Sequence, residues 1–255
     1  MCKVSILSFL FFIYLNNLNG QSPCPGLSTI KDIDGNSYNT ILIGKQCWLK
    51  ENLKARKYND GTIIPLDNSG GIKGADLSQK WGHLTTGAIT VYAHDYQNFP
   101  TFGFLYNWFA VTDSRGICPK NWHVPSEEEY TELVLHLEYI VNGTVVNEMD
   151  TTFSWIEGAM LFYEEIGGSL KTKGNKYWEI PNIGATNATG FTALPGGYRN
   201  LDGKFYSLGY DARFWSTSEY DSENAWSKGL SYQHSDIENG YDKKNMGLSI
   251  RCLKN

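Results

Sequence analysis

The segment from Gly116 to Leu133, GICPKNWHVPSEEEYTEL, brings together a cysteine, a histidine and three consecutive glutamates. Thiolates and imidazoles ligate metal ions, and carboxylates act as general acids or bases. The spacing supports neither use, because His123 has no HExxH partner and Cys118 has no second cysteine in a CxxC pair. We therefore expect His123 to be a structural, hydrogen-bonded histidine.

The three glutamates are explained by the helix that should follow Pro125. Ser126 is a suitable N-cap residue and Glu129 stands three positions later, which is the pattern of a capping box. Acidic residues in the first turn are favoured by the helix dipole, by about 0.3–1 kcal/mol each. Apolar residues then recur at helical spacing and predict one buried face: Tyr130, Leu133, Val134, Leu137 and Val141.

A second acidic segment could be a calcium loop or a β-turn. Oxygen-bearing residues stand at positions 1, 3 and 5 of such a loop: Asp32, Asp34 and Asn36. An EF-hand also needs glycine at position 6 and glutamate at position 12, where this chain has Ser37 and Gly44. We favour a β-hairpin over residues 29–54, with its tight turn at Asp34-Gly35-Asn36.

The rest of the chain reads as short elements joined by loops. Residues 58–65 predict another Asp-Gly turn, and residues 67–103 a long irregular segment. The apolar run at 104–111 is either a strand or a buried helix. A second amphipathic helix is predicted from Trp155 to about Ile166, and the remainder is β-like.

The N-terminal residues predict export. Lys3 precedes an apolar run from Val4 to Leu15, and polar residues follow, which is typical of a signal peptide over residues 1–20. That run is too short to span a bilayer, and no later segment is suitable. We expect a secreted or cell-surface protein with one domain over residues 21–255.

Cysteine content and charge narrow the functional class. Four cysteines remain after the predicted signal peptide, and an even count in an exported chain favours disulfides, with three pairings open: Cys24, Cys47, Cys118 and Cys252. The chain has 22 basic and 27 acidic residues, without a Lys/Arg patch. Nucleic acid is therefore a poor partner.

Several motifs, in this order, resemble the Fibrobacter succinogenes major paralogous domain: DIDGNSYNTILIGKQCWLKENLK, LYNWFAV, GICPKNWHVPSEEEYTEL, GGSLKTKG, GFTALPGGYRNLDGKF, FWSTSE and LSIRCLKN. That family is common in exported proteins of Bacteroidetes-type bacteria and is similar to the C-type lectin-like superfamily. The resemblance implies an α+β fold with two helices, small antiparallel sheets and long irregular loops. It also implies disulfides between Cys118 and Cys252 and between Cys24 and Cys47.

Sugar-binding C-type lectins hold calcium with Glu-Pro-Asn and Trp-Asn-Asp motifs. This chain has no Glu-Pro-Asn, and Lys228 stands where the aspartate after Trp226 would be. We therefore expect no cofactor and no metal site of the familiar type. One loop stays a candidate for a ligand or a calcium ion, against the simpler interpretation as a solvated turn: Asp221, Glu223, Asn224 and Trp226.

We expect an exported binding or adhesion module whose ligand is a glycan or a protein. Loops rich in Tyr, Trp, Gly and Asn are typical of recognition surfaces. A structural surface component without a small ligand is the alternative. An enzyme resembling the formylglycine-generating enzymes is disfavoured, because the four cysteines are explained as disulfides and no catalytic motif is present.

Overall fold

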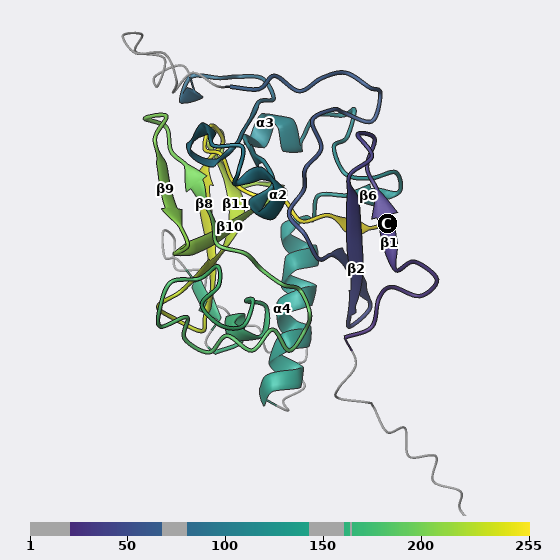
Figure 1. Cartoon of the computed structure of the whole chain (residues 1–255), viewed down its shortest axis with the longest axis vertical. Helices are drawn as coiled ribbons and strands as arrows, with labels where there is room; N and C mark the ends of the chain where they lie inside the picture. The colour runs from purple at the N-terminus through teal and green to yellow at the C-terminus, as the bar shows by residue number, and fades with distance from the viewer. Residues whose placement is uncertain (1–20, 68–80, 143–160, 164) are drawn as a thin grey trace, which may run out of the picture.

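The structure is a computed structural model that describes residues 21–67, 81–142, 161–163 and 165–255 (Figure 1). The predicted signal peptide, residues 1–20, lies outside the described residues. Within these ranges, none of the helices combines the length and the apolar character needed to span a bilayer.

The first sheet has five strands in the order β1-β2-β3-β13-β6. Their bounds are β1 Thr29–Lys31, β2 Ser37–Ile43, β3 Gln46–Leu49, β6 Trp122–His123 and β13 Leu253–Lys254. The last strand of the chain therefore lies between β3 and β6, which joins the C-terminus to the N-terminal hairpins.

The tight turn predicted between β1 and β2 is confirmed. Gly35 has a φ of 85°, which a residue with a side chain rarely adopts. The Asp32 carboxylate accepts hydrogen bonds from the backbone N–H groups of Asp34 (3.0 Å) and Asn36 (2.9 Å), and from the Tyr38 hydroxyl (2.6 Å). Its oxygens thus serve the turn, as the β-hairpin interpretation expects.

The second sheet has six strands in the order β7-β12-β11-β10-β8-β9, antiparallel except where β8 runs parallel to β10. Their bounds are β7 Leu161–Tyr163, β8 Gly196–Arg199, β9 Phe205–Leu208, β10 Asp211–Glu219, β11 Asn224–Ser231 and β12 Ile237–Lys243. A two-stranded sheet pairs β4 Ile89–Thr90 with β5 Leu105–Tyr106.

The predicted second helix over residues 155–166 is wrong where the structure describes it. Leu161–Tyr163 form strand β7, and Ile237 of β12 pairs with Tyr163. The edge of β12 offers backbone donors and acceptors, so pairing with it satisfies β7 better than an isolated helical turn would. Residues 155–160 and 164 lie outside the described residues.

The helix predicted after Pro125 is confirmed as α4, Glu127–Asn142, and the capping box forms at its start. The Glu129 N–H donates to Ser126 Oγ (3.2 Å), and the Ser126 N–H donates to Glu129 Oε2 (2.8 Å). Four of the predicted apolar positions are buried: Tyr130, Leu133, Val134 and Leu137. The side chain of Val141 lies outside the description.

Helix α4 lies between the two larger sheets (Figure 1), and its apolar face joins them in one core. Ile41 and Trp48 reach this core from the five-stranded sheet, and Phe214 and Leu230 from the six-stranded sheet. A second core, on the other side of β10, contains Trp215 and both disulfides.

The other helices that the structure describes over their whole length are single turns rather than a second long helix. They are η2 Tyr92–His94, α2 Phe99–Phe102, α3 Trp108–Val111 and η3 Gly167–Ser169. The run at 104–111 is therefore both a strand, β5, and a helix, α3. Asn107 separates the two, because its side chain accepts a hydrogen bond from the Ala110 N–H and caps α3.

Two disulfides are present, and both are the pairs that the resemblance implies. Cys24 is bonded to Cys47 in β3, and Cys118 is bonded to Cys252 next to β13. All four cysteines are buried. The fold is thus a disulfide-bonded α and β structure with few helices.

Candidate functional site

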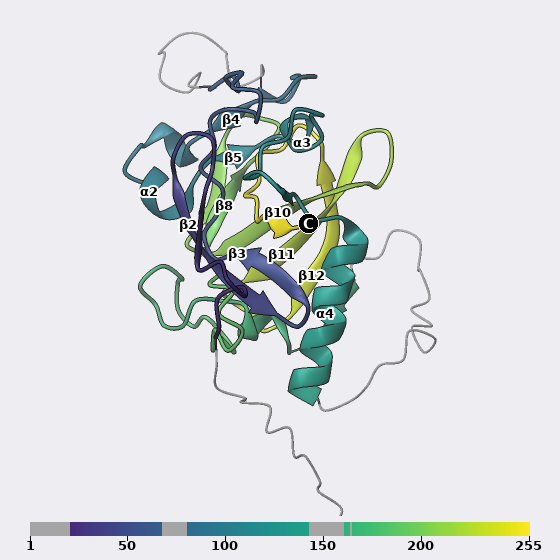
Figure 2. The ribbon, with the colours of Figure 1, turned by 90° about the vertical axis from the view of Figure 1, so that its right-hand side faces the viewer.

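The candidate loop from the sequence forms the tip of the β10–β11 hairpin, which extends past the first turn of α4 (Figure 2, light green). Asp221 Oδ1 accepts from the backbone N–H groups of Glu223 (2.7 Å) and Asn224 (2.8 Å), and Oδ2 accepts from Asn224 Nδ2 (2.7 Å). The Asn224 side chain and these backbone donors lower the pKa of Asp221. Its carboxylate therefore holds the turn together.

Glu223 faces a different partner from Asp221. Its carboxylate forms an ion pair with the ammonium group of Lys243, which stands opposite Asn224 in the β11–β12 register. The Glu223 side chain is 70% exposed and that of Lys243 is 42% exposed. Such an exposed pair contributes little to stability, because water competes for both charges.

Trp226 belongs to an aromatic cluster that we define as Tyr220, Trp226 and Tyr241. Trp226 in β11 pairs with Tyr241 in β12. The Tyr220 ring stacks on Tyr241, with centroids 4.1 Å apart and planes 6° apart, and meets Trp226 edge-on at 5.0 Å. Tyr220 and Tyr241 are 37% and 41% exposed. The cluster is therefore a rigid aromatic surface open to solvent.

A cleft of about 330 Å³ lies beside the same hairpin tip. Its lining includes Phe109, Leu201, Glu223, Lys243, Lys244 and Asn245. The buried Lys244 ammonium group contacts the Glu219 carboxylate and donates to the Ser222 carbonyl (2.9 Å). It also lies 4.8 Å from the centroid of the Trp108 ring. Lys244 thus fixes the tip against α3 and the end of β12.

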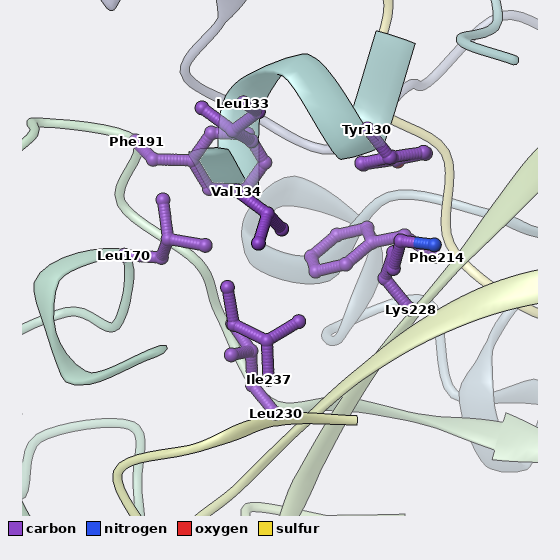
Figure 3. A pocket seen from close by; sticks show the side chains of 9 residues that line it. All are labelled: Tyr130, Leu133, Val134, Leu170, Phe191, Phe214, Lys228, Leu230 and Ile237. Atoms are coloured by element: carbon purple, nitrogen blue, oxygen red, sulfur yellow. The ribbon is translucent and has the colours of Figure 1, made fainter. Parts of the chain in front are cut away.

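A smaller cavity lies in the core under α4 (Figure 3). Its volume of about 20 Å³ and its apolar lining leave no space for a ligand. Lys228 borders it and donates to both carboxylate oxygens of Glu127, each at 2.6 Å. Burial raises the pKa of Glu127 and lowers that of Lys228, so each charge depends on the other. Glu127 therefore does more than complement the helix dipole.

His123 is hydrogen-bonded at both ring nitrogens, as predicted. Its Nε2 lies 2.8 Å from Glu129 Oε1, and its Nδ1 lies 2.6 Å from Asn255 Oδ1. Across the described ranges, no three His, Cys, Asp or Glu side chains are placed to hold one metal ion.

The sequence placed four residues at the candidate site, Asp221, Glu223, Asn224 and Trp226, but did not point to Tyr220 and Tyr241. Tyr220 could have been found, because it directly precedes the loop. Tyr241 could not, since its position beside Trp226 depends on the β11–β12 register.

Comparison with known proteins gives one match. The family model for the Fibrobacter succinogenes major domain covers residues 41–254, which include both larger sheets except β1 and residues 37–40 of β2, and all of the hairpin-tip residues. Searches of curated proteins and of solved structures give no match. The family match spans most of the chain, so this protein belongs to the Fibrobacter succinogenes major domain family.

Proposed function

We propose that this protein is an exported, non-catalytic binding module of C-type lectin-like fold, which presents the β10–β11 hairpin tip to an extracellular glycan or protein. The observation that carries this proposal is the solvent-exposed stack of Tyr220 on Tyr241, next to Trp226. Tyrosine and tryptophan offer a large contact area at a low cost in side-chain entropy, which suits them to recognition surfaces.

The placement of the cluster supports binding. Trp226 and Tyr241 stand on paired strands, and Lys244 fixes the adjacent tip, so the rings are held in position before a ligand arrives. The two disulfides suit an oxidising, extracellular environment. Every cysteine after residue 20 is in a disulfide, which leaves those thiols no part in a reaction.

The proposal includes no cofactor. A calcium ion at the tip is disfavoured, because the Asp221 carboxylate already accepts three hydrogen bonds and Glu223 is paired with Lys243. A structural surface component without a small ligand is the competing function. It would use the same disulfides but would not need exposed, stacked rings.

Binding to glycan and protein arrays, with calcium and with a chelator, tests the proposal. We expect the purified protein to bind at least one ligand class, and Tyr241→Ala to weaken that binding roughly tenfold or more, as removal of a central aromatic contact does. Tyr96→Ala is the matched control, since Tyr96 is an exposed tyrosine outside the cluster. Equal losses in both variants, or no ligand on either array, would contradict a binding site at the hairpin tip.

A further inference from the structure

Lys243 stands between the aromatic cluster and the cleft. Tyr241 and Lys243 are two positions apart in β12, so their side chains project from the same face of the strand. Lys243 also lines the cleft beside the hairpin tip. A ligand lying on Tyr241 would therefore meet an ammonium group at its edge.

The Glu223 carboxylate, which forms the ion pair with Lys243, is easily displaced. The Glu223 side chain is mostly exposed, and the turn is held by the Asp221 carboxylate rather than by that of Glu223. An anionic group of a ligand could take the place of Glu223 on Lys243 and leave Glu223 in water. Glu223 would then act as a competitor for the site.

Lys244 differs from Lys243 in its role. Its side chain is buried, and its ammonium group holds the Ser222 carbonyl while contacting Glu219. This contact fixes the tip from which Glu223 reaches Lys243. Lys244 is therefore a positioning residue, and the accessible charge of the site is that of Lys243.

We propose that the hairpin tip binds a carboxylate-bearing sugar residue of a glycan, a uronate, whose ring lies on Tyr241 and whose carboxylate binds Lys243 in place of Glu223. This inference rests on the proposed binding function and names its ligand class. The cleft of about 330 Å³ is at the lower end of the size range of small-ligand sites.

A sugar fits the tip better than a protein partner. The exposed cluster consists of tyrosine and tryptophan rings, which offer both an apolar face and a polar edge. Pyranose rings present C–H groups on one face and hydroxyl groups around the edge, which matches that surface. The large aliphatic side chains that are exposed in the described part of the chain all lie away from the hairpin tip: Ile33, Ile63, Ile180 and Ile183.

Calorimetric titration of the intact protein tests the proposal. The probes are oligomers of galacturonic, glucuronic and mannuronic acid, each compared with its neutral methyl ester. We expect at least one acid to bind, and its ester to bind at least tenfold more weakly. Lys243→Met should weaken the acid tenfold or more, and Lys243→Arg should retain most of the affinity, since it keeps the charge.

Glu223→Gln gives the sharpest outcome. Because Glu223 competes for Lys243, its removal should tighten binding of the acid and leave the weak ester affinity unchanged. Weaker binding by Glu223→Gln would overturn the proposal, because it would make Glu223 a ligand contact. Lys204→Met is the matched control, as Lys204 is an exposed lysine on the β8–β9 turn, and it should change nothing.

The outcome also separates this inference from the proposed function. Suppose that a neutral glycan binds to the wild type, more weakly to Tyr241→Ala, and equally well to Lys243→Met. That result would overturn the uronate proposal and leave the proposed binding function in place. An acidic peptide such as oligoglutamate that binds through Lys243 while every uronate fails would also overturn it. If no ligand binds on the arrays, both the binding function and the uronate proposal are contradicted.

Discussion

The two larger sheets are held together by different chemistry. Both disulfides join strands or flanking residues of the five-stranded sheet. The six-stranded sheet contains no cysteine. Instead, buried lysines with several hydrogen bonds each connect its strands to the segments that pack on it, notably Lys171 and Lys228.

Lys171 shows how a buried cation fixes irregular backbone. Its ammonium group is fully buried and donates to the carbonyls of Ile183 (2.7 Å), Ser231 (2.8 Å) and His234 (2.7 Å). One side chain thus ties a loop to the end of β11 and to the connection that follows. Carbonyl oxygens from irregular segments need such donors, because no strand pairs with them.

Arg251 connects the two regions. It is fully buried next to Cys252, and its guanidinium donates to Asn52 Oδ1 (2.9 Å) and to the carbonyls of Phe191 (2.6 Å) and Thr192 (2.8 Å). Burial lowers the pKa of Arg251 to about 10. Adjacent residues therefore anchor the C-terminus in two ways, covalently through Cys252 and by hydrogen bonds through Arg251.

The largest expected effect comes from the long disulfide. Cys118→Ser with Cys252→Ser opens a loop with a sequence separation of 134, so the chain-entropy model gives a loss of about 5 kcal/mol in the free energy of unfolding. The same change at Cys24 and Cys47, with a separation of 23, should cost about 3 kcal/mol. Denaturant unfolding of both double variants measures the difference.

Hydrogen exchange shows where each loss falls. Amide protection should decrease most in β3, β6 and β13 when the long disulfide is absent, while β10 to β12 keep theirs. Uniform loss across both sheets would mean that the distinction between the two regions does not hold.

A slightly smaller effect is expected for the buried pair in the six-stranded sheet. Lys228→Met or Glu127→Gln leaves one charged or polar partner buried without its counterpart, which costs about 3–5 kcal/mol. Thermal or denaturant unfolding of each variant measures this. Replacing both residues, as Glu127→Leu with Lys228→Met, should recover most of the loss, because an apolar pair needs no such partner.

A double variant as unstable as the single ones would show that the apolar replacement does not fit this core. The contacts of Lys228 with Glu127 (2.6 Å) and with the neighbouring Asn239 amide oxygen would then be required for packing as well as for charge. In that case the Lys228–Glu127 pair, like a disulfide, could not be replaced by apolar side chains without loss of stability.

The features predicted from the sequence are those with local signals. The Asp34-Gly35 turn, the capping box of Ser126 and Glu129, and the hydrogen-bonded His123 depend on residues close together in the chain or on a missing motif. Contacts that bridge strands had no such signal. The pairing of Lys228 with Glu127 joins residues 101 positions apart, and only the packing of α4 on β11 brings them together.

The candidate site divides in the same way. The acidic residues Asp221 and Glu223 pointed to the β10–β11 hairpin tip in the sequence. The aromatic surface beside it depends on the β11–β12 register, which the sequence does not show. The predicted second helix failed for a related reason, since the free edge of β12 decides the structure of Leu161–Tyr163. Tertiary pairing overrides local preference for a segment that short.

The last stability effect, similar in size to that of the shorter disulfide, is expected at Lys171. Lys171→Met should cost about 3 kcal/mol at pH 7, because it leaves three backbone carbonyls without their donor. Burial lowers the pKa of Lys171 to about 8 in the folded protein, against 10.5 for an ordinary lysine. Below pH 8 both the folded and the unfolded chains hold the proton, so this group adds no pH dependence there.

Between pH 8 and 10.5 the unfolded chain binds more protons at Lys171 than the folded protein does. The free energy of unfolding of the wild type, measured relative to Lys171→Met, should therefore rise across this window. Denaturant unfolding of both proteins at several pH values tests the sign. A fall instead would mean that the three carbonyl contacts retain the proton on Lys171 more strongly than burial expels it, so that folding raises the pKa of this lysine.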